Sequence, residues 1–129
     1  MSTKLDIKVF NDQVQKELDG ANRKFPAFSS DHEGYAVLLE EYQELVHEFQ
    51  NVEYYLGNSW DSIKKGDHIT TLDALEMMRI HLRESYKELV QTAAMVEKWL
   101  DRYRADRNLT DVEPLARKTG VQISEEYDQ

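Results

Sequence analysis

The chain has 129 residues, of which 40% are hydrophobic and 32% charged, and its formal net charge is −9. This length suits one domain with a core of its own, whereas two independent domains would each be undersized. An acidic surface repels phosphate backbones, so we do not expect DNA or RNA as a partner. A small phosphorylated ligand carried by a divalent cation is compatible with the same charge.

Membrane insertion, secretion and thiolate chemistry are all unexpected for this sequence. No apolar run approaches the ~20 residues that cross a bilayer, and the opening stretch MSTKLDIKVF lacks the apolar core of a signal peptide. The chain has no cysteine, which removes disulfides and thiolate metal sites. We therefore expect a cytoplasmic protein with no membrane partner.

The hydrophobic pattern predicts an all-α fold, because strand-type alternation is nowhere sustained. A first helix is expected over residues 5–19, with Ile7, Phe10, Val14 and Leu18 on one side and Gly20 as its stop. This first helix is expected to be shorter than the two helices that follow. The three are expected to form a helical bundle in which the two long helices pack antiparallel.

A second helix is expected from Asp31 to Leu56, where Gly57 ends it. Ser30 and Glu33 have the spacing of a capping box, in which each side chain accepts a hydrogen bond from a free amide of the first turn. The apolar stripe of this helix is expected to face the core: Tyr35, Leu38, Leu39, Tyr42, Leu45, Val46 and Phe49.

A polar connection over residues 57–70 is expected to expose Trp60, and Thr70 with Asp73 is expected to cap the third helix, over residues 72–107. The apolar residues of the third helix follow a heptad seam that packs lengthwise on other helices: Leu75, Met78, Leu82, Tyr86, Leu89, Ala93, Val96, Leu100 and Tyr103. The domain is thus expected to span residues 1–107. Residues 108–129 are expected to form a tail, in which a short helix can follow Pro114.

Polar side chains run beside the apolar stripes of the two long helices. On the second helix this stripe carries Glu41, Glu44 and Glu48, while Glu40 points further outward. On the third helix the corresponding residues are His81, Glu84, Glu88 and Gln91.

If the two helices pack antiparallel, Glu41 and Glu44 can meet Glu88 and Gln91 at the margin of the core. Carboxylates that face one another repel unless a cation joins them, and oxygen ligands select a hard cation such as Mg²⁺ or Mn²⁺. A plainer explanation is equally open. With 25 acidic residues in the chain, acid pairs spaced three apart arise freely, and most are solvated. His81 in particular can be a ligand or a surface residue.

The sequence resembles the MazG family in two blocks. One is the E-E-x-x-E motif at residues 40–44, and the other is a second acidic motif on a later helix. The stretches FPAFSSDHEGYAVLLEEYQEL and KELVQTAAMVEKWL resemble the short, stand-alone MazG-like proteins often carried by phages and prophages, and the resemblance covers residues 20–101. It implies an all-α, Mg²⁺-dependent hydrolase that cleaves an NTP or dNTP into a monophosphate and pyrophosphate.

Carried over by position, the resemblance assigns metal ligands to Glu41, Glu44 and Glu88. Glu40 becomes a further ligand or an organiser of the attacking water, so Glu40 and Glu41 are the catalytic candidates. Gln91 stands where the wider family has Asp. Its amide oxygen can still coordinate a metal, but the missing negative charge should lower the affinity.

Substrate contacts are expected from basic residues that can meet the outer phosphates and from one aromatic that can stack on a base: Arg23, Lys24, Lys64, Lys65 and Trp60. Each of these residues also has a plainer role, as a surface charge or as a ring packed on the core. The family precedent and the long apolar seams both predict a homodimer or homotetramer.

Three functions are left open by the sequence. The first is an active pyrophosphohydrolase, favoured by the complete set Glu40, Glu41, Glu44 and Glu88. The second is a catalytically impaired MazG-like protein that works as a binding or regulatory module, favoured by Gln91. The third is a helical assembly protein with no ligand, which predicts no response to cations.

Overall fold

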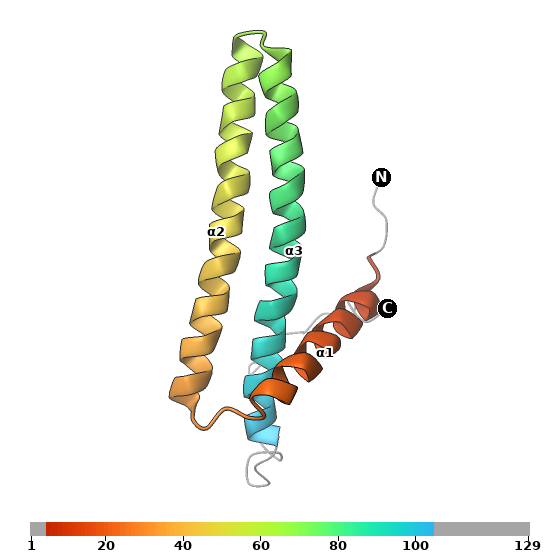
Figure 1. The fold of residues 1–129 in the computed structure, drawn as a ribbon, viewed down its shortest axis with the longest axis vertical. Helices are drawn as coiled ribbons and strands as arrows, with labels where there is room; N and C mark the ends of the chain where they lie inside the picture. Colours follow the sequence, from red (N-terminus) through yellow and green to blue (C-terminus); the bar gives the residue numbers. More distant parts are fainter. Residues whose placement is uncertain (1–4, 105–129) are drawn as a thin grey trace, which may run out of the picture.

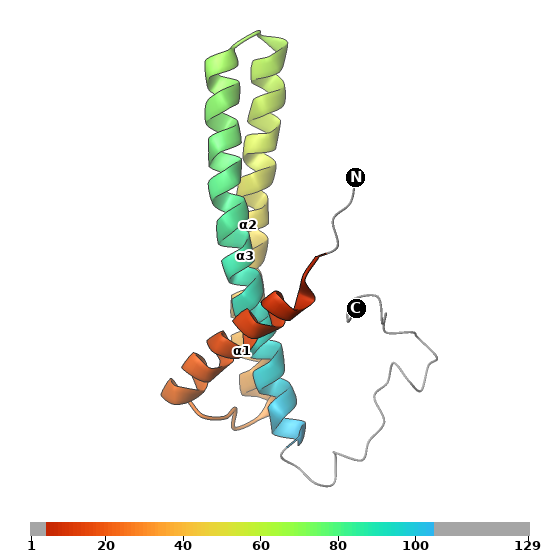
Figure 2. The ribbon, with the colours of Figure 1, turned by 90° about the vertical axis from the view of Figure 1, so that its right-hand side faces the viewer.

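The computed structural model describes residues 5–104, which form three α-helices and no strand: α1 (Ile7–Lys24), α2 (Asp31–Lys64) and α3 (His68–Arg104) (Figure 1). The prediction of an all-α fold is confirmed. Helices α2 and α3 lie antiparallel along each other as a long hairpin, and α1 crosses α3 near the end of the hairpin that is remote from the α2–α3 turn (Figure 2). The predicted tail over residues 108–129 lies outside the described residues.

Both glycine stops predicted from the sequence are wrong. Helix α1 continues through Gly20 to Lys24, and α2 continues through Gly57 to Lys64. A glycine inside a helix costs about 1 kcal/mol relative to alanine, a local penalty that the packing of a long helix offsets. Most of the predicted loop over residues 57–70 is therefore helical, and Trp60 stands on α2 rather than in a loop.

The α2–α3 turn consists only of residues 65–67. Gly66 has a φ of 68°, in the left-handed region that glycine adopts without strain. Asp67 caps α3, because its carboxylate accepts from the amide and the hydroxyl of Thr70 at 3.0 and 2.6 Å. The predicted cap at Thr70 and Asp73 is wrong, and α3 begins four residues earlier than expected, at His68.

The predicted cap of α2 is correct in one half. The Ser30 hydroxyl accepts from the amide of Glu33 at 3.1 Å. The reciprocal bond is displaced by one residue, because the Glu33 carboxylate accepts from the hydroxyl and the amide of Ser29 at 2.9 and 3.4 Å. These hydrogen bonds hold the end of the α1–α2 connection against the first turn of α2.

The hydrophobic core lies where α1 crosses the hairpin. Ala94 of α3 has no exposed surface, and its small side chain leaves room for α1 to pack closely. The other buried members of this core come from α1, from the α1–α2 connection and from α3: Val14, Leu18, Phe28, Val90 and Met95.

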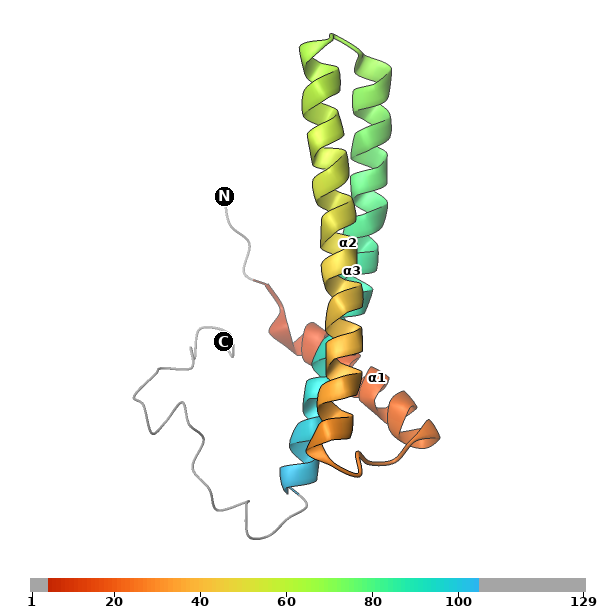
Figure 3. The same cartoon turned by 90° about the vertical axis from the view of Figure 1, so that its left-hand side faces the viewer.

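The apolar stripes of α2 and α3 are largely exposed along the hairpin. For α2 this contradicts the expectation that the stripe faces the core, whereas for α3 the expected packing on other helices is not met within the described residues of one chain. Leu45 and Met78 are the members of these stripes that are buried. Large apolar side chains that stay exposed include Tyr35, Tyr42, Phe49, Leu75, Leu82, Tyr86, Leu89, Val96, Leu100 and Tyr103. Figure 3 shows the hairpin from the side on which α2 lies in front of α3. None of the helices within residues 5–104 is long and apolar enough to cross a membrane.

Two glycines of α2 predict opposite effects of substitution by alanine. A Cβ at Gly34 would lie 2.9 Å from Cγ and Cδ2 of Trp99, whose indole donates to Asp31 at 2.9 Å, so Gly34→Ala should lower the melting temperature. A Cβ at Gly57 would meet nothing within 4 Å, so Gly57→Ala should raise the free energy of unfolding by about 1 kcal/mol. Thermal unfolding followed by circular dichroism measures both changes. Shifts of the same sign would contradict the close packing of Gly34 on Trp99.

Candidate metal centre

Three carboxylates converge between α2 and α3. Glu41 and Glu44 stand one turn apart on α2, Glu88 faces them from α3, and each offers an oxygen that lies within 4.8 Å of the others. The register of the two helices is fixed there by Thr92, whose hydroxyl donates to the carbonyl oxygen of Glu88 at 2.7 Å and contacts that of Glu41 at 3.3 Å. The antiparallel pairing predicted for these carboxylates is therefore present.

Burial and mutual repulsion raise the pKa of two of these groups. Burial is the main cause for Glu41, and the negative charges of Glu44, Glu88 and Glu40 add to it. Burial also raises the pKa of Glu88, and the neighbouring Glu44 carboxylate adds to the shift, because it favours a shared proton and repels a second negative charge. The site thus favours added positive charge, in the form of protons or of a cation.

Two oxygens of this group lack a partner. Oε2 of Glu41 and Oε2 of Glu88 are buried, and neither accepts a hydrogen bond from any described residue. None of the three carboxylates forms an ion pair within residues 5–104. Buried carboxylate oxygens without partners are costly, and they are the ligand atoms that hard divalent cations take. The residues present therefore fit a cation such as Mg²⁺.

Glu40 and His81 lie beside this group but outside it. Glu40 is exposed and lines a hollow of about 330 Å³ together with Glu44 and Glu88. Nδ1 of His81 is 2.7 Å from Oε2 of Glu48, and the imidazole stacks on Tyr55 with 5.6 Å between ring centroids. His81 is thus a partly buried partner of Glu48 rather than a free surface residue.

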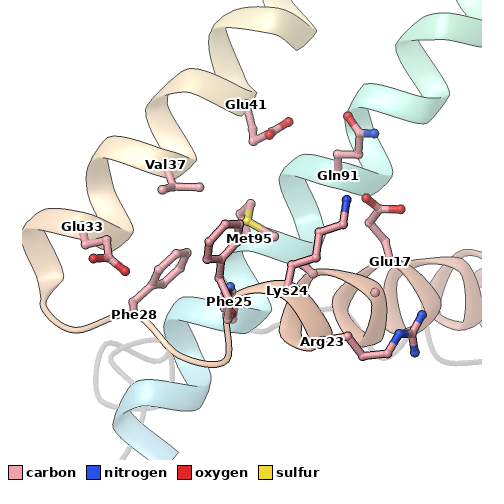
Figure 4. A pocket seen from close by; sticks show the side chains of 13 residues that line it. Glu17, Arg23, Lys24, Phe25, Phe28, Glu33, Val37, Glu41, Gln91 and Met95 are labelled. Atoms are coloured by element: carbon pink, nitrogen blue, oxygen red, sulfur yellow. Dashed lines mark hydrogen bonds between the residues drawn. The ribbon is translucent and has the colours of Figure 1, made fainter.

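A larger cavity of about 880 Å³ opens between α1, the first half of α2 and the second half of α3 (Figure 4). Glu41 and Gln91 lie at one end of it, and Phe28 with Met95 lies further along it. Gln91, predicted as a metal ligand, thus lies at the same end of the cavity as Glu41.

The structure divides the predicted substrate residues into two groups. Arg23 and Lys24 line the large cavity. Trp60, Lys64 and Lys65 stand near the α2–α3 turn, about 28 to 36 Å along the helix axis from Glu41 at 1.5 Å per residue. There the Lys64 ammonium lies 5.5 Å from the Trp60 ring centroid and 3.5 Å from the Asp61 carboxylate. One chain alone does not bring this second group to the carboxylates.

Lys98 and Phe28 are cavity residues that the sequence interpretation missed. Both are buried, with 6% of each residue exposed. A signal for Lys98 was present, because continuing the polar stripe from Glu88 and Gln91 by steps of four and three reaches Met95 and Lys98. For Phe28, which lies in the connection between α1 and α2, the sequence held no such periodic signal.

Comparison of the chain with protein-family models, with curated proteins and with solved structures finds no match in any of the three. What the site can do therefore has to be argued from its own residues and from the sequence resemblance.

We expect Glu41→Gln to stabilise the metal-free protein at neutral pH. Because the pKa of Glu41 is raised in the folded state, its contribution to stability is full below the unfolded-state pKa and is lost as the pH rises through the folded-state pKa. The amide of the variant does not ionise. In EDTA at pH 7 the variant should therefore melt at a higher temperature than the wild type, and the gap should close as the pH falls below the ordinary value of 4.5.

Differential scanning fluorimetry between about pH 4 and pH 8 measures this gap. Glu40→Gln is the matched control, because Glu40 is exposed and its substitution should change the melting temperature less. A lower melting temperature for Glu41→Gln at pH 7 would mean that the Glu41 carboxylate is stabilised by the fold and is not a strained ligand.

Proposed function

We propose that the protein is a MazG-like nucleotide pyrophosphohydrolase that converts an NTP or dNTP into the monophosphate and pyrophosphate with Mg²⁺, or Mn²⁺ in its place. One observation carries this proposal. The three carboxylates that the sequence resemblance designates as ligands, Glu41, Glu44 and Glu88, converge with their oxygens within 4.8 Å of one another. If these glutamates were only solvated surface acids, there would be no reason for the residues assigned as ligands by resemblance to be the ones that converge.

The residues have distinct roles in the proposed reaction. Glu41, Glu44 and Glu88 hold the cation, and Oε2 of Glu41 and of Glu88 is available for it because neither has another partner among the described residues. A bound Mg²⁺ supplies the positive charge that the phosphate oxygens need during displacement. Glu40, exposed beside Glu44 and Glu88, is the remaining carboxylate that can orient the attacking water.

The large cavity suits the rest of the substrate. Its volume of about 880 Å³ is within the range of small-molecule sites. Arg23 and Lys24 line it and can meet the outer phosphates. Trp60, Lys64 and Lys65 can contribute only in an assembly that brings the α2–α3 turn of one copy to the carboxylates of another.

The outward apolar faces support assembly of the protein as a homodimer or homotetramer. Leu75, Leu82 and Leu89 recur every seven residues on α3, and each leaves between 41% and 55% of its surface exposed. An apolar surface of this extent on two helices is typical of an interface with another copy.

A catalytically impaired form of the same protein is the second candidate. It is favoured by Gln91, a neutral amide beside Glu41 at the end of the cavity where the family has a carboxylate. The site would then bind a cation or a nucleotide and regulate a partner without turnover.

A release assay tests the proposed reaction. We expect EDTA-sensitive formation of monophosphate and pyrophosphate from at least one member of a panel of NTPs and dNTPs. Glu44→Gln should reduce this turnover by about 100-fold or more, because it removes a ligand, while leaving the helical content unchanged, because Glu44 is exposed. Glu53→Gln, another exposed glutamate of α2, is the control and should keep full activity.

The outcomes separate the candidates. Turnover that survives in Glu44→Gln would contradict the assigned ligand set. A cation that raises the melting temperature without turnover on any nucleotide would favour the impaired form. Neither turnover nor a cation effect would leave a helical assembly protein with a solvated acidic stripe.

We expect Gln91→Asp to lower the dissociation constant for Mg²⁺ by about tenfold, or about 1.4 kcal/mol, because it restores a negative charge next to Glu41. Titration of Mg²⁺ against the melting temperature measures the change. Gln91→Asn has the same size without the charge and should not tighten binding. Equal affinities for the two variants would remove Gln91 from the surroundings of the cation.

A further inference from the structure

Lys98 of α3 is a buried ammonium with no acidic partner among residues 5–104. Only 6% of the residue is exposed, and it forms no ion pair within the part of the chain that the structure describes. Its Nζ donates to the carbonyl oxygen of Phe25 at 2.5 Å and lies 4.9 Å from the ring centroid of Phe28. An ammonium has three protons to donate, so this environment leaves donor capacity unused.

The unused capacity belongs to the lining of the large cavity. Lys98 lines that cavity together with Phe25, Phe28 and Met95. Phe25 and Phe28 lie away from the end at Glu41 (Figure 4). Ten residues of α3 separate Lys98 from Glu88, which is about 15 Å of helix. Lys98 is therefore too far along α3 to contact a cation held by the three carboxylates.

The walls at this end suit a planar group. Phe28 is buried, whereas Phe25 is 74% exposed and stands at the rim. Aromatic faces accept any base by stacking, so the rings alone do not distinguish one base from another. On the α1 side the cavity is lined by the small residues Gly20 and Ala21 and by three charged residues, Glu17, Arg23 and Lys24.

We infer that this end of the cavity holds the base of the nucleotide and that Lys98 selects bases with a carbonyl oxygen on the edge farthest from the sugar: uracil, thymine and guanine. This inference rests on the proposed function. Uracil and thymine present O4 on that edge and guanine presents O6, and both oxygens accept a hydrogen bond. Cytosine and adenine present an amino group there, which places a donor against the Lys98 ammonium and leaves both unsatisfied.

A structural role for Lys98 predicts a different result. Its bond to the Phe25 carbonyl fastens the α1–α2 connection to α3. If that were its whole role, substitution would lower stability and weaken all nucleotides alike. The ratio of affinities for carbonyl and amino bases would not change.

Binding of nucleoside monophosphates tests the inference without turnover. Isothermal titration calorimetry with Mg²⁺ present would compare dUMP, dTMP and dGMP with dCMP and dAMP, none of which has a phosphoanhydride bond to cleave. We expect the wild type to bind dUMP, dTMP and dGMP at least about tenfold more tightly than dCMP and dAMP. Lys98→Met should abolish this ratio of affinities. Lys98→Gln, whose amide both donates and accepts, should bind both groups and serves as a second variant if Lys98→Met does not fold. Lys8→Met, an exposed lysine of α1 outside the cavity, is the matched control and should keep the wild-type ratio.

Three results would overturn the inference. One is a wild-type preference for dCMP or dAMP, the second is equal affinity for all five ligands, and the third is an unchanged ratio in both Lys98 variants. If a preference is absent while the release assay still shows EDTA-sensitive turnover, the base assignment fails and the proposed function stands. Failure of every nucleotide both to bind and to turn over would overturn the two together.

Discussion

Three negatively charged groups are held together between α2 and α3, and the positions of the core and of the exposed apolar faces depend on this arrangement. Glu41, Glu44 and Glu88 face one another across the α2–α3 interface, and burial raises the pKa of two of them. Their repulsion opposes the hairpin at this level. The core where α1 crosses α3 lies directly beside it, centred on Ala94, and the Thr92 hydroxyl ties the two backbones. The strongest packing of the chain is thus next to the place where the helices would otherwise separate.

The outward apolar faces follow from the same arrangement. Side chains of one helix are fixed in direction by the 100° step between residues, so a helix that turns its acidic stripe toward its partner turns the neighbouring apolar stripe away. Leu82 and Leu89 are exposed for this reason, while His81, Ser85 and Glu88 lie nearer α2. A carboxylate site inside the hairpin and an apolar surface outside it are therefore two consequences of a single rotation of α3. The proposed oligomer and the proposed metal site are linked by geometry.

Features that depend on local helical periodicity could be predicted from the sequence. Features that depend on how the helices pack against one another could not. Helical spacing correctly predicted three helices and the meeting of Glu41 and Glu44 with Glu88, because antiparallel packing needs only two matching stripes. The glycine stops failed because packing outweighed a local preference at Gly20 and Gly57. The heptad seam predicted an apolar face without saying whether another helix of the same chain covers it. Periodicity extends the polar stripe of α3 to Lys98, but the burial of Lys98 depends on how the α1–α2 connection folds back over α3, which is not a periodic feature.

The costs built into this region distinguish a ligand site from a plain assembly surface. An assembly protein needs the outward apolar faces. It gains nothing from buried carboxylate oxygens that have no partner among residues 5–104, or from a buried ammonium that forms no ion pair there. Each unsatisfied buried polar group costs on the order of 1–3 kcal/mol, a large share of the marginal stability of a small domain. Oε2 of Glu41 and of Glu88 are such groups, and the Lys98 ammonium, bonded to the Phe25 carbonyl, lines the cavity that Glu41 also lines. A ligand that brings a cation to the carboxylates and a hydrogen-bond acceptor to Lys98 satisfies both sites. A nucleotide bound with Mg²⁺ has that chemistry.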